Sequence, residues 1–162
     1  MPGMLSRILR AARFEREAYL HAVVGQNAVA DGLIVVTAVW LVIGAVVAGG
    51  FDLILYLRWV LNGLFSWIVL SGVVYLLGKY VFEGYGSFPG TMAMSAVCHP
   101  TLLLILVTRL WLSGFPAILA GTGWFLATLV AGTRVALDLR TERAALSVGG
   151  GFLVWLVFVG IL

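Results

Sequence analysis

Long apolar runs dominate this chain, and only short polar segments separate them. An α-helix crosses the hydrocarbon core of a bilayer with about 20 apolar residues, because each residue advances the helix by about 1.5 Å. Five runs approach this length, at residues 28–49, 59–78, 90–111, 115–137 and 144–162. The pattern therefore predicts an all-α polytopic membrane bundle, with five transmembrane helices in one domain of residues 28–162.

Residues 1–27 follow a different pattern, in which apolar and charged positions recur with helical spacing. Apolar residues at 5, 8, 9, 12, 19, 20 and 23 fall near one helical face, and the other side carries four arginines: Arg7, Arg10, Arg13 and Arg16. This periodicity is typical of an amphipathic helix lying in the headgroup plane. We therefore expect an interfacial N-terminal helix whose arginines contact lipid headgroups. The alternative is an ordinary solvated helix.

Composition supports a membrane protein and narrows its partners. Of the 162 residues, 62% are hydrophobic and only 10% are charged, and the mean hydropathy is +1.11. Soluble domains carry about 25% charged residues. The net charge of +3 is spread between apolar runs and forms no basic patch, so we expect no nucleic-acid partner. The expected partners are membrane lipids and either other membrane proteins or further copies of this chain.

Basic residues predict the orientation in the membrane. If the N-terminus is cytoplasmic and the chain crosses five times, only Arg58 and Arg109 fall outside. The other eight of the ten basic residues fall inside. Cytoplasmic loops carry an excess of Lys and Arg. We therefore expect a cytoplasmic N-terminus and an external C-terminus. The alanine-, glycine- and arginine-rich composition indicates a bacterial cytoplasmic membrane.

A proline lies inside the third apolar run, directly after a histidine. Pro100 removes one backbone hydrogen bond and leaves the carbonyl of Ala96 without its usual donor. We expect a bend near residues 96–100, on a helix buried among the others. His99 is favoured as a neutral imidazole bonded to a helix carbonyl, and the alternative is an intramembrane polar site on a transport path.

Small residues recur at four-residue spacing on the fourth run, and they predict a helix-packing surface. These residues are Ala117, Gly121, Gly123, Ala127 and Ala131. Small side chains let helix backbones approach closely in membranes. The surface could serve packing within one chain or contact with another protein. Near the end of the same run, Arg134 and Asp138 are one helical turn apart and can pair.

Residues able to carry chemistry are sparse. The chain has seven carboxylates, two histidines and one cysteine. Cys98 and His99 are neighbours, but adjacent side chains on a helix point about 100° apart and do not form a nucleophile–base pair. We therefore expect no catalytic residue, no metal site and no cofactor.

Two separate stretches, GYGSFPG…CHP and ALDLRTERAAL, carry a common pattern. It consists of a Gly-x-Gly-Ser turn, a Cys-x-Pro step and two Ala-Leu pairs: Gly84, Gly86, Ser87, Cys98, Pro100, Ala136, Leu137, Ala145 and Leu146. Over roughly residues 10–162 the chain resembles the Ypt-interacting protein (Yip) family of five-span membrane proteins. The resemblance implies a bacterial-type member with that fold. Eukaryotic members of the family act in vesicle traffic and bind prenylated Rab-type GTPases.

These patterns favour a non-enzymatic membrane scaffold or accessory subunit of the Yip-like type. Membership of a larger respiratory or photosynthetic complex is one form of that role. One alternative is a small transporter or channel in which His99 lines the path, and another is an enzyme acting on lipid. A water-filled polar cavity in the bundle would favour transport, whereas a dry core would favour the scaffold.

The orientation can be tested with reporters fused after Leu162. We expect a periplasm-active reporter to be active there and a cytoplasm-active reporter to be silent, because five crossings from an inside N-terminus place the C-terminus outside. Fusions after Arg140 provide the opposite control. Activity of the cytoplasmic reporter after Leu162 would refute the five-span topology.

Overall fold

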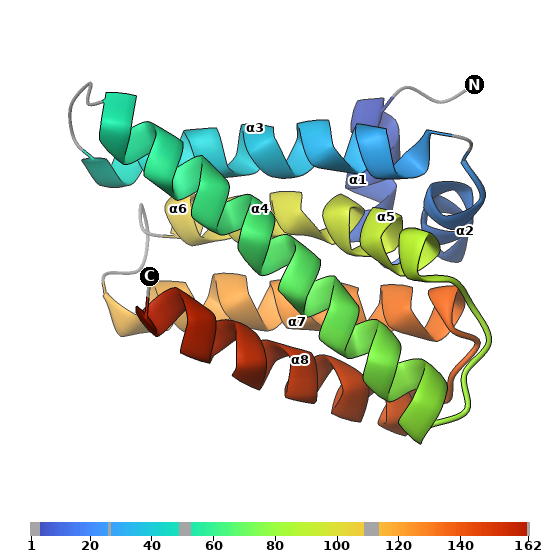
Figure 1. The fold of residues 1–162 in the computed structure, drawn as a ribbon. Helices are drawn as coiled ribbons and strands as arrows, with labels where there is room; N and C mark the ends of the chain where they lie inside the picture. The colour runs from blue at the N-terminus through green and yellow to red at the C-terminus, as the bar shows by residue number, and fades with distance from the viewer. Residues whose placement is uncertain (1–3, 26, 49–52, 109–113, 162) are drawn as a thin grey trace.

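The computed structural model describes residues 4–25, 27–48, 53–108 and 114–161, and the elements of this part of the chain are helices (Figure 1). In chain order the elements are α1 (Met4–Ala12), α2 (Arg16–Val24), α3 (Ala28–Ala48), α4 (Leu53–Leu76), the π-helical turn η1 (Leu77–Val81), α5 (Phe88–Cys98), the 3-10 segment η2 (His99–Leu103), α6 (Leu104–Thr108), α7 (Phe115–Ala136) and α8 (Thr141–Ile161). No strand occurs within the described residues.

The long helices alternate in direction, and α4 crosses the others obliquely (Figure 1). In the described part of the chain, four helices are long and apolar enough to cross a membrane: Ala28–Val47, Leu53–Val81, Phe88–Thr108 and Phe115–Ala136. The predicted fifth span, residues 144–162, extends past the last described side chain and stays a prediction. Its helix, α8, packs against α4 and α7.

The N-terminal region forms two short helices instead of the single helix expected for residues 1–27. The chain turns at Phe14, whose φ is 62°, and the Glu15 amide donates to the Arg10 carbonyl at 3.0 Å. A left-handed residue followed by such a bond ends a helix. Both helices cross the end of the bundle where α3 and α5 begin (Figure 1). α2 buries Ala18, Tyr19 and Ala22 against its neighbours, so this region packs on the protein as well as facing outward.

Charge is concentrated at that same end of the bundle. Eight of the ten basic residues belong to α1, α2 and the turn between them, to η1, or to the end of α7, the start of α8 and the turn that joins them: Arg7, Arg10, Arg13, Arg16, Lys79, Arg134, Arg140 and Arg143. The basic residues of the folded chain are therefore asymmetric along its long axis, and the orientation in a membrane stays a prediction.

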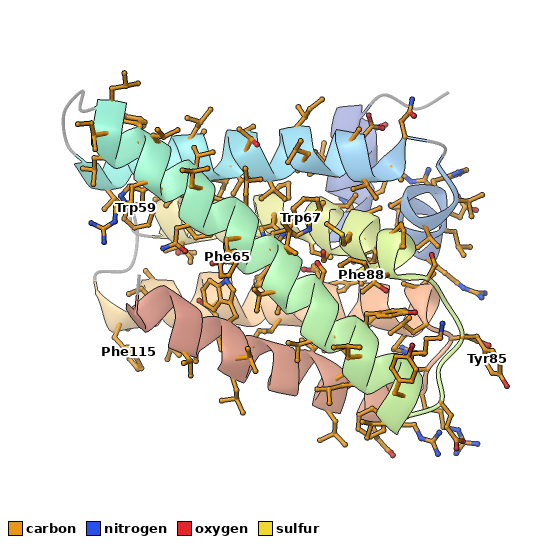
Figure 2. All side chains as sticks on the ribbon, viewed as in Figure 1. Trp59, Phe65, Trp67, Tyr85, Phe88 and Phe115 are labelled. Carbon is orange, nitrogen blue, oxygen red and sulfur yellow. The ribbon has the colours of Figure 1, made fainter. Side chains whose placement is uncertain are left out.

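Aromatic side chains mark both ends of the long helices. Figure 2 shows Trp59 and Phe115 near one end and Tyr85 and Phe88 near the other. Tyr85 is 81% exposed and Phe115 is 69% exposed, so both rings face outward. Of these four residues, Trp59 and Tyr85 have the amphipathic rings that are enriched at the headgroup level on both sides of a membrane. This placement agrees with the bundle crossing a bilayer along its long axis.

Glycines bring the helices together in the core. A Cβ on Gly63 of α4 would lie 2.2 Å from the Trp40 ring of α3, and a Cβ on Gly121 of α7 would lie 2.8 Å from the Ile105 amide nitrogen of α6. Only glycine allows such approaches. Lipid provides no hydrophobic force between helices, so close packing of this kind is a main source of association.

The connector before α5 is also held by backbone contacts. The Tyr85 amide donates to the Leu137 carbonyl at 2.8 Å, which joins this connector to the turn after α7. A Cβ on Gly86 would lie 2.4 Å from the Ala136 carbonyl oxygen, and one on Gly84 would lie 2.9 Å from that of Leu137. The Gly-x-Gly turn and the first Ala-Leu pair, which are separate in the sequence, are therefore in contact.

The contact between Gly63 and Trp40 generates a stability prediction. We expect Gly63→Ala to lower the free energy of unfolding by about 1–3 kcal/mol, because overpacking a filled interior costs this much. The measurement is reversible unfolding in mixed micelles. Gly149→Ala in α8 is the matched control, since its added Cβ meets nothing within 4 Å. Equal effects of the two substitutions would contradict the packing argument.

Candidate functional site

Hydrogen bonds between side chains link α4 to α5 in the middle of the bundle. The Trp67 indole N–H lies 2.9 Å from Ser95 Oγ and 3.1 Å from the Met92 carbonyl. Ser71 Oγ lies 2.6 Å from Ser95 Oγ. All three side chains are buried. Because buried polar groups need partners where water is absent, this arrangement fixes the register of the two helices.

The backbone of the third run departs from regular α-helix at the position expected from Pro100. α5 ends at Cys98, and the next five residues form the 3-10 segment η2. Pro100 has no N–H for the Ala96 carbonyl, and the His99 amide donates to that carbonyl instead. This shift removes the ordinary donor of the Ser95 carbonyl. His99 Nδ1 lies 2.9 Å from that oxygen.

The His99 ring is enclosed by protein. Its side chain is 1% exposed, and the ring packs edge-on against Phe125 of α7 with centroids 5.4 Å apart. A carbonyl oxygen can only accept a hydrogen bond, so Nδ1 carries the proton in this arrangement. The ring therefore serves as a donor to the backbone, which is the interpretation favoured from the sequence.

Threonines continue the polar contacts toward α7. Thr101 Oγ1 donates to the Cys98 carbonyl at 2.7 Å and lies 3.4 Å from Thr128 Oγ1, which donates to the Phe125 carbonyl at 2.8 Å. We call the whole set the core polar cluster: Trp67, Ser71, Ser95, His99, Thr101 and Thr128. Trp67, Ser71 and Ser95 bond across α4 and α5, whereas Thr101 of η2 and Thr128 of α7 lie close together and each donates to a carbonyl of its own segment.

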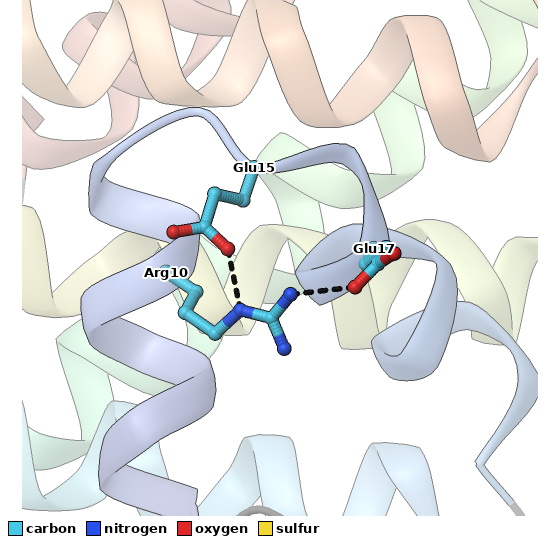
Figure 3. A network of polar contacts seen from close by, with 3 residues as sticks. All are labelled: Arg10, Glu15 and Glu17. Carbon is cyan, nitrogen blue, oxygen red and sulfur yellow. Dashed lines mark hydrogen bonds and ion pairs between the residues drawn. The ribbon is translucent and has the colours of Figure 1, made fainter.

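A second cluster of polar contacts holds α1 against α2 (Figure 3). Arg10 Nε donates to Glu15 at 2.5 Å, and Arg10 Nη2 donates to Glu17 at 2.6 Å. The bonds to Glu15 and Glu17 raise the pKa of Arg10. The Tyr19 hydroxyl donates to the Ala11 carbonyl at 2.6 Å, and burial raises the pKa of Tyr19. These contacts lock the turn between the two helices.

The same turn is attached to the middle of α7. The rings of Phe14 and Trp124 have centroids 5.2 Å apart, and Trp124 Nε1 donates to the Ala12 carbonyl at 3.2 Å. The left-handed backbone at Phe14 is unfavourable for a bulky residue. Its contact with Trp124 offsets part of that cost and places α1 across the flank of the bundle.

The four N-terminal arginines predicted to contact headgroups have different surroundings. Arg13 and Arg16 are exposed. Arg10 is held by its two glutamates, so its guanidinium is less available to lipid than the sequence pattern suggests. The side chain of Arg7 lies outside the described residues. Lipid contact by these residues stays a prediction.

A groove of about 460 Å³ opens between α2 and the C-terminal end of α7. It is lined by Phe14, Arg16, Tyr19, Ala131, Arg134, Val135, Asp138 and Leu139. In the part of the chain that the structure describes, Arg134 forms no ion pair with Asp138. The expected pair requires helical spacing, but α7 ends at Ala136, and Asp138 has a φ of 51°.

The small residues of α7 divide between two faces. Ala117 and Gly121 are buried, and Gly121 lies against α6. Gly123 and Ala127 face outward, and Ala131 is partly buried beside the groove. The buried face also uses Phe125, Thr128 and Gly132. Because α7 is apolar on both faces, its sequence does not distinguish the buried face from the outward one. The four-residue spacing therefore predicted a single packing surface for all five small residues.

The described residues contain no group of three His, Cys, Asp or Glu side chains that could hold a metal ion. Comparison of the chain with protein-family models, with curated proteins and with solved structures finds no match. The Yip-like resemblance therefore stays a prediction from the residues that carry it.

The role of His99 can be tested by a double-mutant cycle with Pro100. We expect His99→Leu to lower the free energy of unfolding by about 1–3 kcal/mol, because the Ser95 carbonyl loses its donor. With Pro100→Ala, the regular backbone bonds can form again. The cost of His99→Leu should then fall by about 1–2 kcal/mol, measured by unfolding in mixed micelles.

His21→Leu is the matched control for this cycle, since His21 is exposed on α2. It should cost little in either background. An equal cost of His99→Leu with and without Pro100 would show that His99 does not compensate for the proline. A normally folded His99→Leu protein that loses ion flux in vesicles would assign His99 to transport.

Proposed function

We propose that this chain is a non-enzymatic integral membrane protein that acts as a scaffold or accessory subunit. The observation that carries the proposal is the hydrogen bonding of the buried polar side chains in the core. Each side chain of the core polar cluster bonds a neighbouring side chain or a carbonyl, and His99 is 1% exposed. Groups committed to holding helices together are poorly placed to bind a substrate, so the proposal assigns function to the outer surface.

The outer face of α7 supports contact with another membrane protein. Gly123 and Ala127 are one turn apart and exposed, and an added Cβ at Gly123 meets nothing within 4 Å. Small residues at such spacing let a second helix approach closely. Trp124, which is 43% exposed, adjoins them and offers a large apolar contact. A partner helix could lie along this face.

The finer parts of the proposal come from the sequence. They are a bacterial cytoplasmic membrane, a cytoplasmic N-terminus, five spans and a role related to the Yip-like resemblance. The concentration of basic residues at one end of the bundle supports this orientation. A transporter with His99 on its path has less support, because the ring is enclosed and its Nδ1 faces a backbone carbonyl.

The proposal can be tested by isolating the protein in polymer-bounded patches of its native membrane. We expect a defined membrane protein, or a second copy of this chain, to co-purify at a fixed ratio. The Gly123→Leu/Ala127→Leu variant should retain about tenfold less of it, since a loss of ~1.4 kcal/mol of contact has this effect. Quantitative mass spectrometry measures the ratio.

The matched control is Ala45→Leu, which enlarges an exposed small residue on α3. It should leave the ratio unchanged. A single chain without a protein companion, together with substrate-dependent flux after reconstitution, would contradict the scaffold and favour the transporter. Equal loss of the companion in the control would refute the assignment to α7.

A further inference from the structure

We propose that the groove between α2 and α7 binds the headgroup of an anionic phospholipid, with Arg16 and Arg134 contacting its phosphate. The inference requires only that the bundle is embedded in a membrane. It does not depend on the scaffold role, although the groove lies on the same side of α7 as the exposed residues Gly123 and Ala127.

Charge is the first argument. Arg16 and Arg134 come from different helices, yet both line this groove, and both are exposed. Neither forms an ion pair within the described residues, in contrast to Arg10, whose guanidinium binds two glutamates. A guanidinium presents a fork of N–H donors that matches phosphate oxygens. Two such groups in one hollow form a site suited to a phosphodiester.

The balance of charge favours an anionic lipid over a neutral one. Asp138 is the one carboxylate among the lining residues, so two arginines and one aspartate leave a formal charge of +1. A phospholipid with a single negative charge would neutralise it. The Asp138 carboxylate can accept a hydrogen bond from a headgroup hydroxyl, as a glycerol headgroup would offer.

The shape of the groove is the second argument. One end reaches Phe14, which packs on Trp124, and the other reaches Asp138, beyond the end of α7 at Ala136. Trp124 and Ala136 are about 18 Å apart along a helix axis at 1.5 Å per residue. Arg134 and Asp138 lie toward the end of the bundle, and Phe14 and Ala131 provide an apolar wall. This gradient suits a lipid, because its headgroup stays at the surface and its acyl chain runs inward along α7.

The proposal can be tested by thermal unfolding of the full chain in neutral detergent while lipid is titrated. We expect phosphatidylglycerol to raise the unfolding temperature more than phosphatidylcholine does. Arg16→Gln and Arg134→Gln should each raise the half-effective lipid concentration about fivefold, and both together about 25-fold, because each surface arginine contributes ~1 kcal/mol toward anionic lipid. Asp138→Asn should lower that concentration, since it removes the opposing charge.

Two matched controls remove the same charge elsewhere. Arg13→Gln and Arg140→Gln change exposed arginines that do not line the groove, and each should leave the half-effective concentration within about twofold. Equal weakening by the controls would indicate diffuse attraction to the basic end and would overturn the site. An equal response to phosphatidylcholine would also overturn it.

Further measurements distinguish a lipid from other molecules that could bind in the groove. If inorganic phosphate alone reproduced the shift, the site would bind an ion and the lipid assignment would be wrong. A polypeptide cross-linked to the groove in native membranes would likewise overturn it. If Arg134→Gln impairs folding, Arg134→Lys is the alternative variant. It keeps the positive charge but lacks the planar guanidinium with its paired N–H donors. We expect weaker binding of phosphatidylglycerol by this variant, and an unchanged affinity would refute the phosphate contact.

Discussion

The missing N–H of Pro100 is the constraint around which the middle of the bundle is arranged. In an apolar interior each carbonyl without a donor costs several kcal/mol, so the backbone defect has to be compensated close by. The His99 amide moves to the Ala96 carbonyl, and the His99 ring takes over the Ser95 carbonyl. The Ser95 side chain meanwhile bonds Trp67 and Ser71 of α4. One defect on α5 is thus linked directly to the contacts that position its neighbours.

Close approach of backbones complements these polar contacts. Gly32 of α3 lies where a Cβ would come within 2.8 Å of the Ala96 side chain, beside the Trp67 ring of α4. Packing at such distances maximises dispersion contacts, which remain available to helices when lipid removes the hydrophobic advantage of association. The core therefore combines a few hydrogen bonds with several close helix contacts at glycines. Both depend on the same registers of α3, α4 and α5.

The parts of this structure that sequence predicts are those governed by local or bulk physics. Four spans follow from length and apolarity, and the break at His99–Leu103 follows from a proline that cannot donate in any context. The split N-terminal helix was not predicted, because the turn at Phe14 is supported by Trp124, far along the chain. The sequence also did not predict which face of α7 is buried and which faces outward. Lipid-facing and core-facing positions are both apolar, so only the neighbouring helices distinguish Gly121 from Gly123.

The attachment of the N-terminal helices to α7 also constrains the order in which the protein assembles. The bond from Trp124 to the Ala12 carbonyl joins residues 112 positions apart. At synthesis rates of about 5–20 residues per second, α1 and α2 wait roughly 6–22 s for that partner. During this interval α2 can already pack on α3 and α5, which are synthesised before α7, but Phe14 and Ala12 still lack their contacts with Trp124. Closure of the α1–α2 turn over α7 is therefore a late docking step, and the packing of α8 on α4 and α7 follows it along the chain. The N-terminus, although synthesised first, would be among the last parts to reach its final position.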